Sequence, residues 1–352
     1  MKLLFHIGLN KVASTFIQDV FSLNASLLIK NGLCYAGNRT VSEGMGGSGS
    51  GNASEFALAL RDLDSKKARN IFLRYLDEAR AAKCKTLLLS TEFMYHQLIK
   101  EKQQNLFISL CDELEVYDVG LLVFFRNPLS HAVSAYNHRA GCYDMPSFRN
   151  WVSCKTVNKK NYRDGIDGYE FWSELPLFVK NVLRNDRFGV NVIVLNRNLL
   201  EKVSALVGCN LVPPGKEKSN VSVNCVEGAL LCLLRQKNRY YAHYYRIFSK
   251  ELSDDLKAAD EYIKSLYYGF VGNEIMCVSD EIKEIEKIAF PDKLVDTQSN
   301  KETRLFDENG NPFYVLSSSQ IAVLIKAISR SHSFDIRIRK MVSTILSLVI
   351  KK

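Results

Sequence analysis

Short, uninterrupted apolar runs recur along the first 200 residues and alternate with stretches in which the apolar residues have helical spacing. The runs cover residues 2–7, 86–90, 119–125 and 191–195. A continuous apolar run of this length is typical of a strand buried on both faces, as in a parallel sheet. Helices are predicted over residues 14–29, 65–82 and 169–183. The pattern therefore predicts an α/β fold, with a parallel sheet flanked by helices.

Beyond about residue 225 the pattern changes to helices without obvious strands. These helices are predicted over residues 226–239, 254–268, 279–288, 318–329 and 334–350. We therefore predict an α/β core over residues 1–225 and a C-terminal helical extension over residues 226–352. The extension is either a separate subdomain or a cap packed on the sheet.

Composition and charge narrow the function classes only a little. The chain has 47 basic and 38 acidic residues, a net charge of +9, which favours an anionic ligand but also describes an ordinary basic surface. Its nine cysteines include no C-x-x-C pair, so we predict reduced, mostly buried thiols in a cytoplasmic protein and no metal site. The apolar stretches are too short to span a bilayer.

The most informative segment is the turn between the first strand and the first helix, which reads HIGLNKVASTFIQ. Gly8 ends the strand, Lys11 follows three residues later, and Ser14 and Thr15 open the helix. Backbone N–H groups at such a helix start point at an incoming anion, so phosphate or sulfate fits this P-loop-like turn. A nucleoside-triphosphate P-loop needs a hydroxyl directly after the lysine, whereas this chain has Val12 there.

A second segment, FFRNPLSHAVSAYNHR, follows the run at residues 119–125. Arg126 stands at the strand end, and Ser134 comes eight residues later in a predicted helix. The arginine offers a planar fork of donors to a phosphate, and the serine adds a hydroxyl two helical turns onward. The sequence therefore predicts a second anion-binding group at the end of another strand.

Together the two segments resemble sulfotransferases that use 3′-phosphoadenosine 5′-phosphosulfate (PAPS), whose bacterial members often have H-I-G-x-x-K-T-G-T-T in the first segment. The resemblance covers roughly residues 1–240, and here Val12, Ala13 and Ser14 replace the usual Thr, Gly and Thr. It implies PAPS as the cofactor, with its 3′-phosphate on Arg126 and Ser134. It also implies a 5′-phosphosulfate site formed by Gly8, Asn10, Lys11, Val12, Ala13, Ser14 and Thr15.

The resemblance also implies an activity, the transfer of a sulfuryl group from PAPS to a hydroxyl or amine of a carbohydrate. By analogy with the family, the acceptor is a surface polysaccharide or a glycolipid. Two alternatives stay open. One is a phosphotransferase that uses a nucleoside triphosphate, and the other is a protein that binds PAPS or its desulfated form, PAP, without catalysis.

Catalysis requires charge stabilisation and a base. Lys11 is placed to stabilise the leaving phosphate oxygen. Glu92, just past the run at residues 86–90, is the first candidate for the base that takes the acceptor's proton, although it could instead cap a helix or pair with a lysine. His96, one helical turn later, is the second candidate. Glu43 and Glu55 flank the glycine-rich segment 44–51, which is either a lid over the site or a plain linker. They are less favoured candidates for the base, which a closing lid could bring to the site.

The other histidines and the basic stretches have simpler interpretations. We expect His6 to be a core residue, and His131 and His138 to lie on the surface, the alternative being that one of the two faces the cofactor. Basic residues interleaved with tyrosines suit an acidic saccharide or nucleic acid, but a solvated helix face explains them equally well, and no nucleic-acid partner is expected. The basic C-terminal helix either packs on the protein or makes peripheral membrane contact. The stretches with tyrosines contain Lys155, Lys159, Lys160, Arg163, Arg235, Lys237 and Arg239, and the C-terminal helix contains Arg337, Arg339 and Lys340.

Overall fold

The computed structural model describes residues 1–8, 12–37, 51–142, 148–153, 169, 171–195, 198–214 and 279–289, with single residues between 225 and 271. The chain forms two compact units. The first comprises Met1–Asn127, Ser173–Ser219 and Val278–Leu294, and the second comprises Pro128–Trp172, Asn220–Cys277 and Val295–Lys352. A division at residue 225 stays a prediction from the sequence.

A five-stranded sheet with the order β2-β3-β1-β4-β5 forms the centre of the first unit. Its strands are β1 (Lys2–Gly8), β2 (Leu33–Tyr35), β3 (Thr86–Ser90), β4 (Asp118–Phe125) and β5 (Phe188–Val194). All neighbouring strands pair in parallel, so their carboxyl ends lie at one edge. The predicted α/β class, with a parallel sheet flanked by helices, is confirmed.

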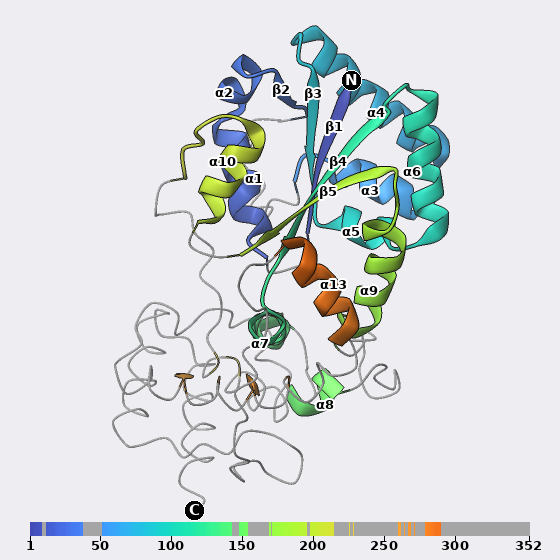
Figure 1. Ribbon diagram of the computed structural model, residues 1–352. Coiled ribbons are helices and arrows are strands. Elements are labelled where there is room, and N and C mark those ends of the chain that lie inside the picture. Colours follow the sequence, from blue (N-terminus) through green and yellow to red (C-terminus); the bar gives the residue numbers. More distant parts are fainter. Residues whose placement is uncertain are drawn as a thin grey trace, which may run out of the picture. The chain divides into compact units, whose positions relative to one another are not determined.

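Helices cover both faces of this sheet (Figure 1). The connection from β1 to β2 runs along the sheet in one direction, and the later connections run in the other. Right-handed crossovers therefore place α1 and α2 on one face, and α3, α4, α5 and α6 on the other. α10, which follows the last strand, lies beside α1 (Figure 1). The helices of this unit are α1 (Ser14–Leu23), α2 (Ala25–Lys30), α3 (Ser54–Arg61), α4 (Ser65–Ala81), α5 (Phe93–Leu98), α6 (Glu101–Glu113), α9 (Phe171–Phe178), the π-helix η2 (Val179–Leu183), α10 (Leu199–Val207) and α13 (Ser279–Ala289).

The alternation of side chains along β1 separates two environments. Phe5 faces an aromatic cluster, with its ring centroid 6.4 Å from Phe56 and 6.3 Å from Phe107. His6, the next residue, faces the opposite side and lies 6.2 Å from the Phe21 ring of α1. The apolar run thus fills both sides of the sheet.

The predicted helix over residues 14–29 is divided in two by Asn24. The Asn24 amide donates to the carbonyls of Val20 (2.8 Å) and Val212 (2.9 Å), and its Oδ1 accepts from the Val212 backbone N–H at 3.0 Å. This side chain competes with the helical hydrogen bonds and ties the helix end to the segment after α10. β2 was not predicted, because three residues are too few to show a strand pattern.

Other elements follow the prediction more closely. α4 covers all but the last of residues 65–82, and its N-cap Asp64 accepts a hydrogen bond of 2.9 Å from the Lys67 backbone N–H. The predicted helix 169–183 appears as α9, with Pro176 inside it, followed by the π-helix. α13 covers the predicted helix 279–288, and its Glu284 pairs with Arg184 at 2.7 Å.

The second unit contains α7 (Pro128–Cys142) and α8 (Phe148–Ser153). Aromatic residues make its core, in which the Tyr136 ring lies 5.0 Å from Phe148 and 5.5 Å from Trp151. The expected surface position of His131 is wrong. This histidine is buried and its Nδ1 is hydrogen-bonded to the Tyr169 hydroxyl, because α7 packs its middle against the aromatic core.

Most of the predicted C-terminal helices lie outside the described residues. Residues 226–239, 318–329 and 334–350 are among them, apart from Gly228, and residues 254–268 are described at single positions only. Within the described part of the chain, no helix combines the length and apolar character needed to cross a membrane.

Candidate anion site and proton acceptors at the carboxyl edge of the sheet

Strand pairing brings three predicted site segments to one edge of the sheet. Gly8 of β1 lies opposite Phe124 of β4, two residues before Arg126. On the other side, His6 of β1 lies opposite Ser90 of β3, two residues before Glu92. The turn after β1 therefore leaves the sheet between the segments that carry Arg126 and Glu92. β1 and β3 are also followed by helices on opposite faces, the arrangement at which open α/β sheets bind ligands.

The start of α1 is shaped around a left-handed residue. Ala13 is the N-cap, with φ 64° and ψ 24°, and its carbonyl accepts the first helical hydrogen bond from Ile17 at 3.1 Å. The first-turn N–H groups after it have no intrahelical partners. A left-handed residue beside right-handed ones turns successive N–H groups towards one side, which is the geometry of an anion-binding nest.

A buried hydroxyl stands at the same place. Ser14 is 2% exposed, and among the described residues its Oγ has no hydrogen-bond partner. A side chain on Gly8 would place its Cβ 3.2 Å from that hydroxyl and 2.9 Å from Val12 Cγ2, so the end of β1 approaches the helix start closely. An unsatisfied buried hydroxyl costs free energy, which an anionic oxygen bound there would recover.

The remaining loop residues are only partly described. The Val12 side chain is fully buried, so it packs into the protein, and Thr15 is half-buried on the first turn of α1. Asn10 and Lys11 lie outside the described residues, as do Glu43 and most of the segment 44–51. The roles given to Asn10 and Lys11 remain predictions.

His6 supports the turn from inside the sheet. It is fully buried, as expected, and burial lowers the pKa of its imidazole to about 3, so it is neutral at neutral pH. Its Nδ1 and Ser90 Oγ form a hydrogen bond of 2.7 Å, which joins the ends of β1 and β3. His6 is therefore a structural residue beneath the candidate site.

The segment before α3 is fastened to the end of β3. Asn52 Oδ1 accepts from the Ser90 backbone N–H at 2.7 Å, and its amide donates to the carbonyls of Ala36 (2.5 Å) and Leu88 (3.2 Å). Gly51 has φ +81° and lies so close to Ser90 that a Cβ would be 2.0 Å from the Ser90 carbonyl oxygen. Only glycine fits this approach.

The two candidate bases belong to the start of α5. Glu92 is the N-cap residue, half-buried, and its side chain makes no capping hydrogen bond to the helix. Four residues later, His96 Nδ1 lies 2.9 Å from Glu174 Oε1 of α9. Sequence reasoning missed Glu174, because it is 78 residues away and no local pattern relates it to His96. Glu55 instead pairs with Arg74 at 3.1 Å on the exposed faces of α3 and α4.

Arg126 and Ser134 belong to different units. Arg126 is half-buried and follows β4 at the carboxyl edge of the first unit, whereas Ser134 is half-buried in α7 of the second unit. The joint role that the sequence assigns to them stays a prediction.

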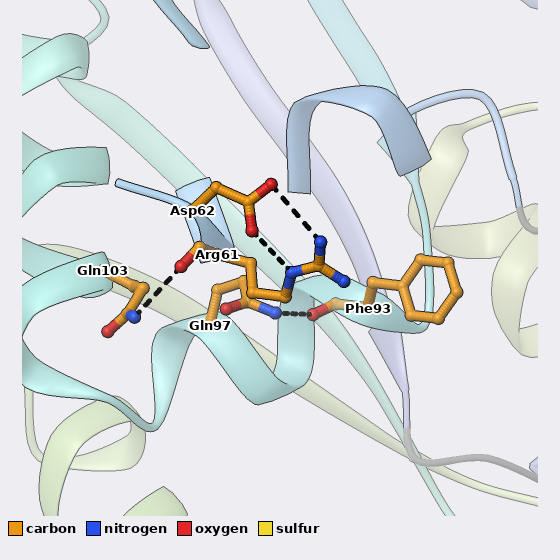
Figure 2. A network of polar contacts seen from close by, with 5 residues as sticks. All are labelled: Arg61, Asp62, Phe93, Gln97 and Gln103. Carbon is orange, nitrogen blue, oxygen red and sulfur yellow. Dashed lines mark hydrogen bonds and ion pairs between the residues drawn. The ribbon is translucent and has the colours of Figure 1, made fainter. Parts of the chain in front are cut away.

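Another cation near α5 is already paired. Arg61 Nε donates to Asp62 Oδ1 at 2.8 Å, and its carbonyl accepts from Gln103 (Figure 2). In the same view the Gln97 amide donates to the Phe93 carbonyl, and the Phe93 ring points away from this network. Asp62 neutralises Arg61, so this cluster offers no net positive charge to an anion.

Neither a metal-binding cluster among the described residues nor a match to a known protein assigns a role to this edge of the sheet. Within the described residues there is no group of three or more His, Cys, Asp or Glu that could hold a metal ion. Cys34, Cys84, Cys111, Cys209 and Cys225 are free thiols, and all of these except Cys209 are buried. No family model, no curated protein and no solved structure matches the chain.

Proposed function

We propose that the chain is a sulfotransferase that moves a sulfuryl group from PAPS to a hydroxyl or amine of a carbohydrate. The observation that carries this proposal is the register of β1 and β4, in which Gly8 lies opposite Phe124. Neighbouring strands are about 4.8 Å apart, so the turn after Gly8 and Arg126 start from adjacent points of one edge. PAPS carries anionic groups on both its 5′ and 3′ positions, and therefore needs two cationic sites close together.

The residues at the start of α1 fit an anionic group. Ser14 offers a buried hydroxyl that has no partner among the described residues, and the left-handed Ala13 orients the first N–H groups of the helix. Gly8 gives the backbone its close approach. The positive end of the α1 dipole points to the same place, so a phosphosulfate is stabilised even before Lys11 is considered.

The chain's residues take complementary roles in the transfer. PAPS supplies the sulfuryl group, whose bond to a phosphate oxygen breaks as a bond to the acceptor oxygen or nitrogen forms. Lys11 and the N–H groups of α1 stabilise the negative charge on the phosphate oxygen that is left behind. The acceptor's proton goes to a base at the end of β3, for which Glu92 and His96 are the candidates.

The carbohydrate acceptor, a polysaccharide or a glycolipid, follows from the family resemblance alone. Cytoplasmic location and peripheral membrane contact also remain sequence-based predictions.

PAP binding and sulfuryl transfer test the proposal together. We expect calorimetry in the presence of a chelator to show binding of PAP by the wild-type protein. Lys11→Ala should lower transfer from radiolabelled PAPS by about 100-fold or more, because it removes a charge at the leaving oxygen. Arg126→Ala should mainly weaken PAP binding, by about 10- to 100-fold, because it removes a charge-assisted contact.

Lys85→Ala and Arg80→Ala are matched controls, since these cations lie at a surface pocket beside the start of β3, at the opposite edge of the sheet. They should bind PAP like the wild type. Unchanged kinetics in both Lys11→Ala and Arg126→Ala would refute the site. Activity that requires magnesium and a nucleoside triphosphate would favour a phosphotransferase, and tight PAP binding without transfer would favour a binding protein.

A further inference from the structure

The pairing of His96 with Glu174 distinguishes between the two candidate bases. His96 lies on α5, which follows β3 directly at the carboxyl edge, and its Nδ1 is 2.9 Å from Glu174 Oε1. The side chains are 25% and 15% exposed. They are thus shielded enough for the contact to hold one geometry, while a quarter of the His96 side chain stays exposed to solvent.

The contact belongs to a firmly packed interface between α5 and the α9–η2 segment. The Tyr95 and Phe178 rings stack with their centroids 5.3 Å apart. Tyr95 is one residue before His96, and Phe178 is four residues after Glu174. The Asn181 amide donates to the Ile99 carbonyl at 2.7 Å, at the other end of α5. These contacts fix the register of the two helices, so the histidine and the carboxylate are held opposite each other.

The chemistry of the two groups determines which ring nitrogen carries the proton. An ionised carboxylate only accepts hydrogen bonds, so Nδ1 of His96 must be the donor. In the neutral imidazole the lone pair is then on Nε2, which is the nitrogen able to take a proton. Glu174 also faces the positive charge that His96 acquires, and therefore stabilises the protonated ring.

We propose that His96 is the base that accepts the proton of the sulfuryl acceptor, and that Glu174 is the positioning residue that fixes its tautomer; this rests on the proposed sulfotransferase function. The acceptor O–H bond breaks as its oxygen bonds to sulfur. The electron pair of that O–H bond stays on the oxygen, and the proton bonds to the lone pair on Nε2 of His96. The bond between sulfur and the phosphate oxygen breaks, and its electron pair stays on PAP. The proton is then released to solvent. Glu92 and Lys100 each stand four residues from His96 on the same segment.

Formation of PAP from PAPS, with water as the acceptor, tests this pair without a known carbohydrate. We expect His96→Ala to lower the turnover number by about 100-fold or more, the usual contribution of a general base. Glu174→Gln should lower it by about 10-fold or more, whereas Glu174→Asp, which keeps the carboxylate, should retain more of it. PAP affinity should stay within about twofold in all three. Imidazole nitrogen chemical shifts should show Nδ1 protonated in the wild type and a mixed tautomer in Glu174→Gln.

Glu113→Gln is the control, since it removes a carboxylate that pairs with Arg69 on the outer helices, away from this edge. It should turn over like the wild type. The inference fails if Glu92→Gln abolishes turnover while His96→Ala does not, or if Glu174→Gln leaves turnover and tautomer unchanged. A wild-type protein that binds no PAP, or that binds PAP without turning over PAPS, would instead refute the proposed function.

Discussion

At the scale of single residues, the candidate site contains a backbone conformation that its own residue does not favour. Ala13 has φ 64°, in the left-handed region, where a Cβ is crowded by the neighbouring carbonyl. The resembling family motif has glycine at this position. The chain keeps the turn geometry with an alanine, so the conformation must be held by the packing of Val12 and the start of α1 around it.

We expect Ala13→Gly to raise the free energy of unfolding by about 0.5–1 kcal/mol. Relief of the left-handed strain, about 1–2 kcal/mol, exceeds the extra chain entropy that glycine brings to the unfolded state. Urea unfolding monitored by circular dichroism measures the change. Ala82→Gly is the control, because Ala82 has φ −75° and should lose stability. A loss of stability in both variants would contradict the strain.

His6 makes folding stability depend on pH. Burial holds the pKa of His6 at about 3 in the folded protein, against an ordinary value of 6.5. Between these values the unfolded chain binds a proton that the folded protein does not, so stability falls as the pH decreases from 6.5 towards 3. The contribution of this group has a slope of up to about 1.4 kcal/mol per pH unit.

Urea unfolding at several pH values in that window tests this residue. The wild type should lose stability more steeply than His6→Gln, which cannot be protonated there. Parallel pH dependences in the two proteins would show that His6 is not the titrating group.

At the scale of elements, the ends of strands and helices are held by long-range contacts that no pattern in the local sequence predicts. Residues 51–54 reach the end of β3 through Asn52 and through the close approach of Gly51 to Ser90. The break between α1 and α2 depends on Val212, which is 188 residues from Asn24. Helical spacing correctly predicts α4, because its buried stripe is a property of its own sequence.

We expect Gly51→Ala to destabilise the protein by about 2 kcal/mol or more. Its Cβ would lie 2.0 Å from the Ser90 carbonyl oxygen, so the backbone must shift, in addition to the cost of φ +81°. Gly208→Ala separates these effects, since Gly208 has φ +70° but nothing within 4 Å of a Cβ. It should cost only about 1 kcal/mol. Equal losses in urea unfolding would argue against the steric contact.

At the scale of the whole molecule, the parallel sheet converts separate sequence motifs into one candidate site. The turn after Gly8 and the segments carrying Arg126 and His96 are far apart in the sequence, but their strands are neighbours in the sheet. The sequence placed each motif at a strand end. The order of the strands and the packing of α9, which supplies Glu174, come only from the three-dimensional arrangement.

The sequence by itself determined the α/β class and most of the strands, because burial on both faces leaves a local record in residue types. Tertiary structure alone decided that β2 exists, that His131 is buried, and that Glu174 meets His96. Each of these depends on a surface provided by a distant segment. A residue's own neighbours in the chain carry no information about such a partner, and the choice is made only when the segments pack.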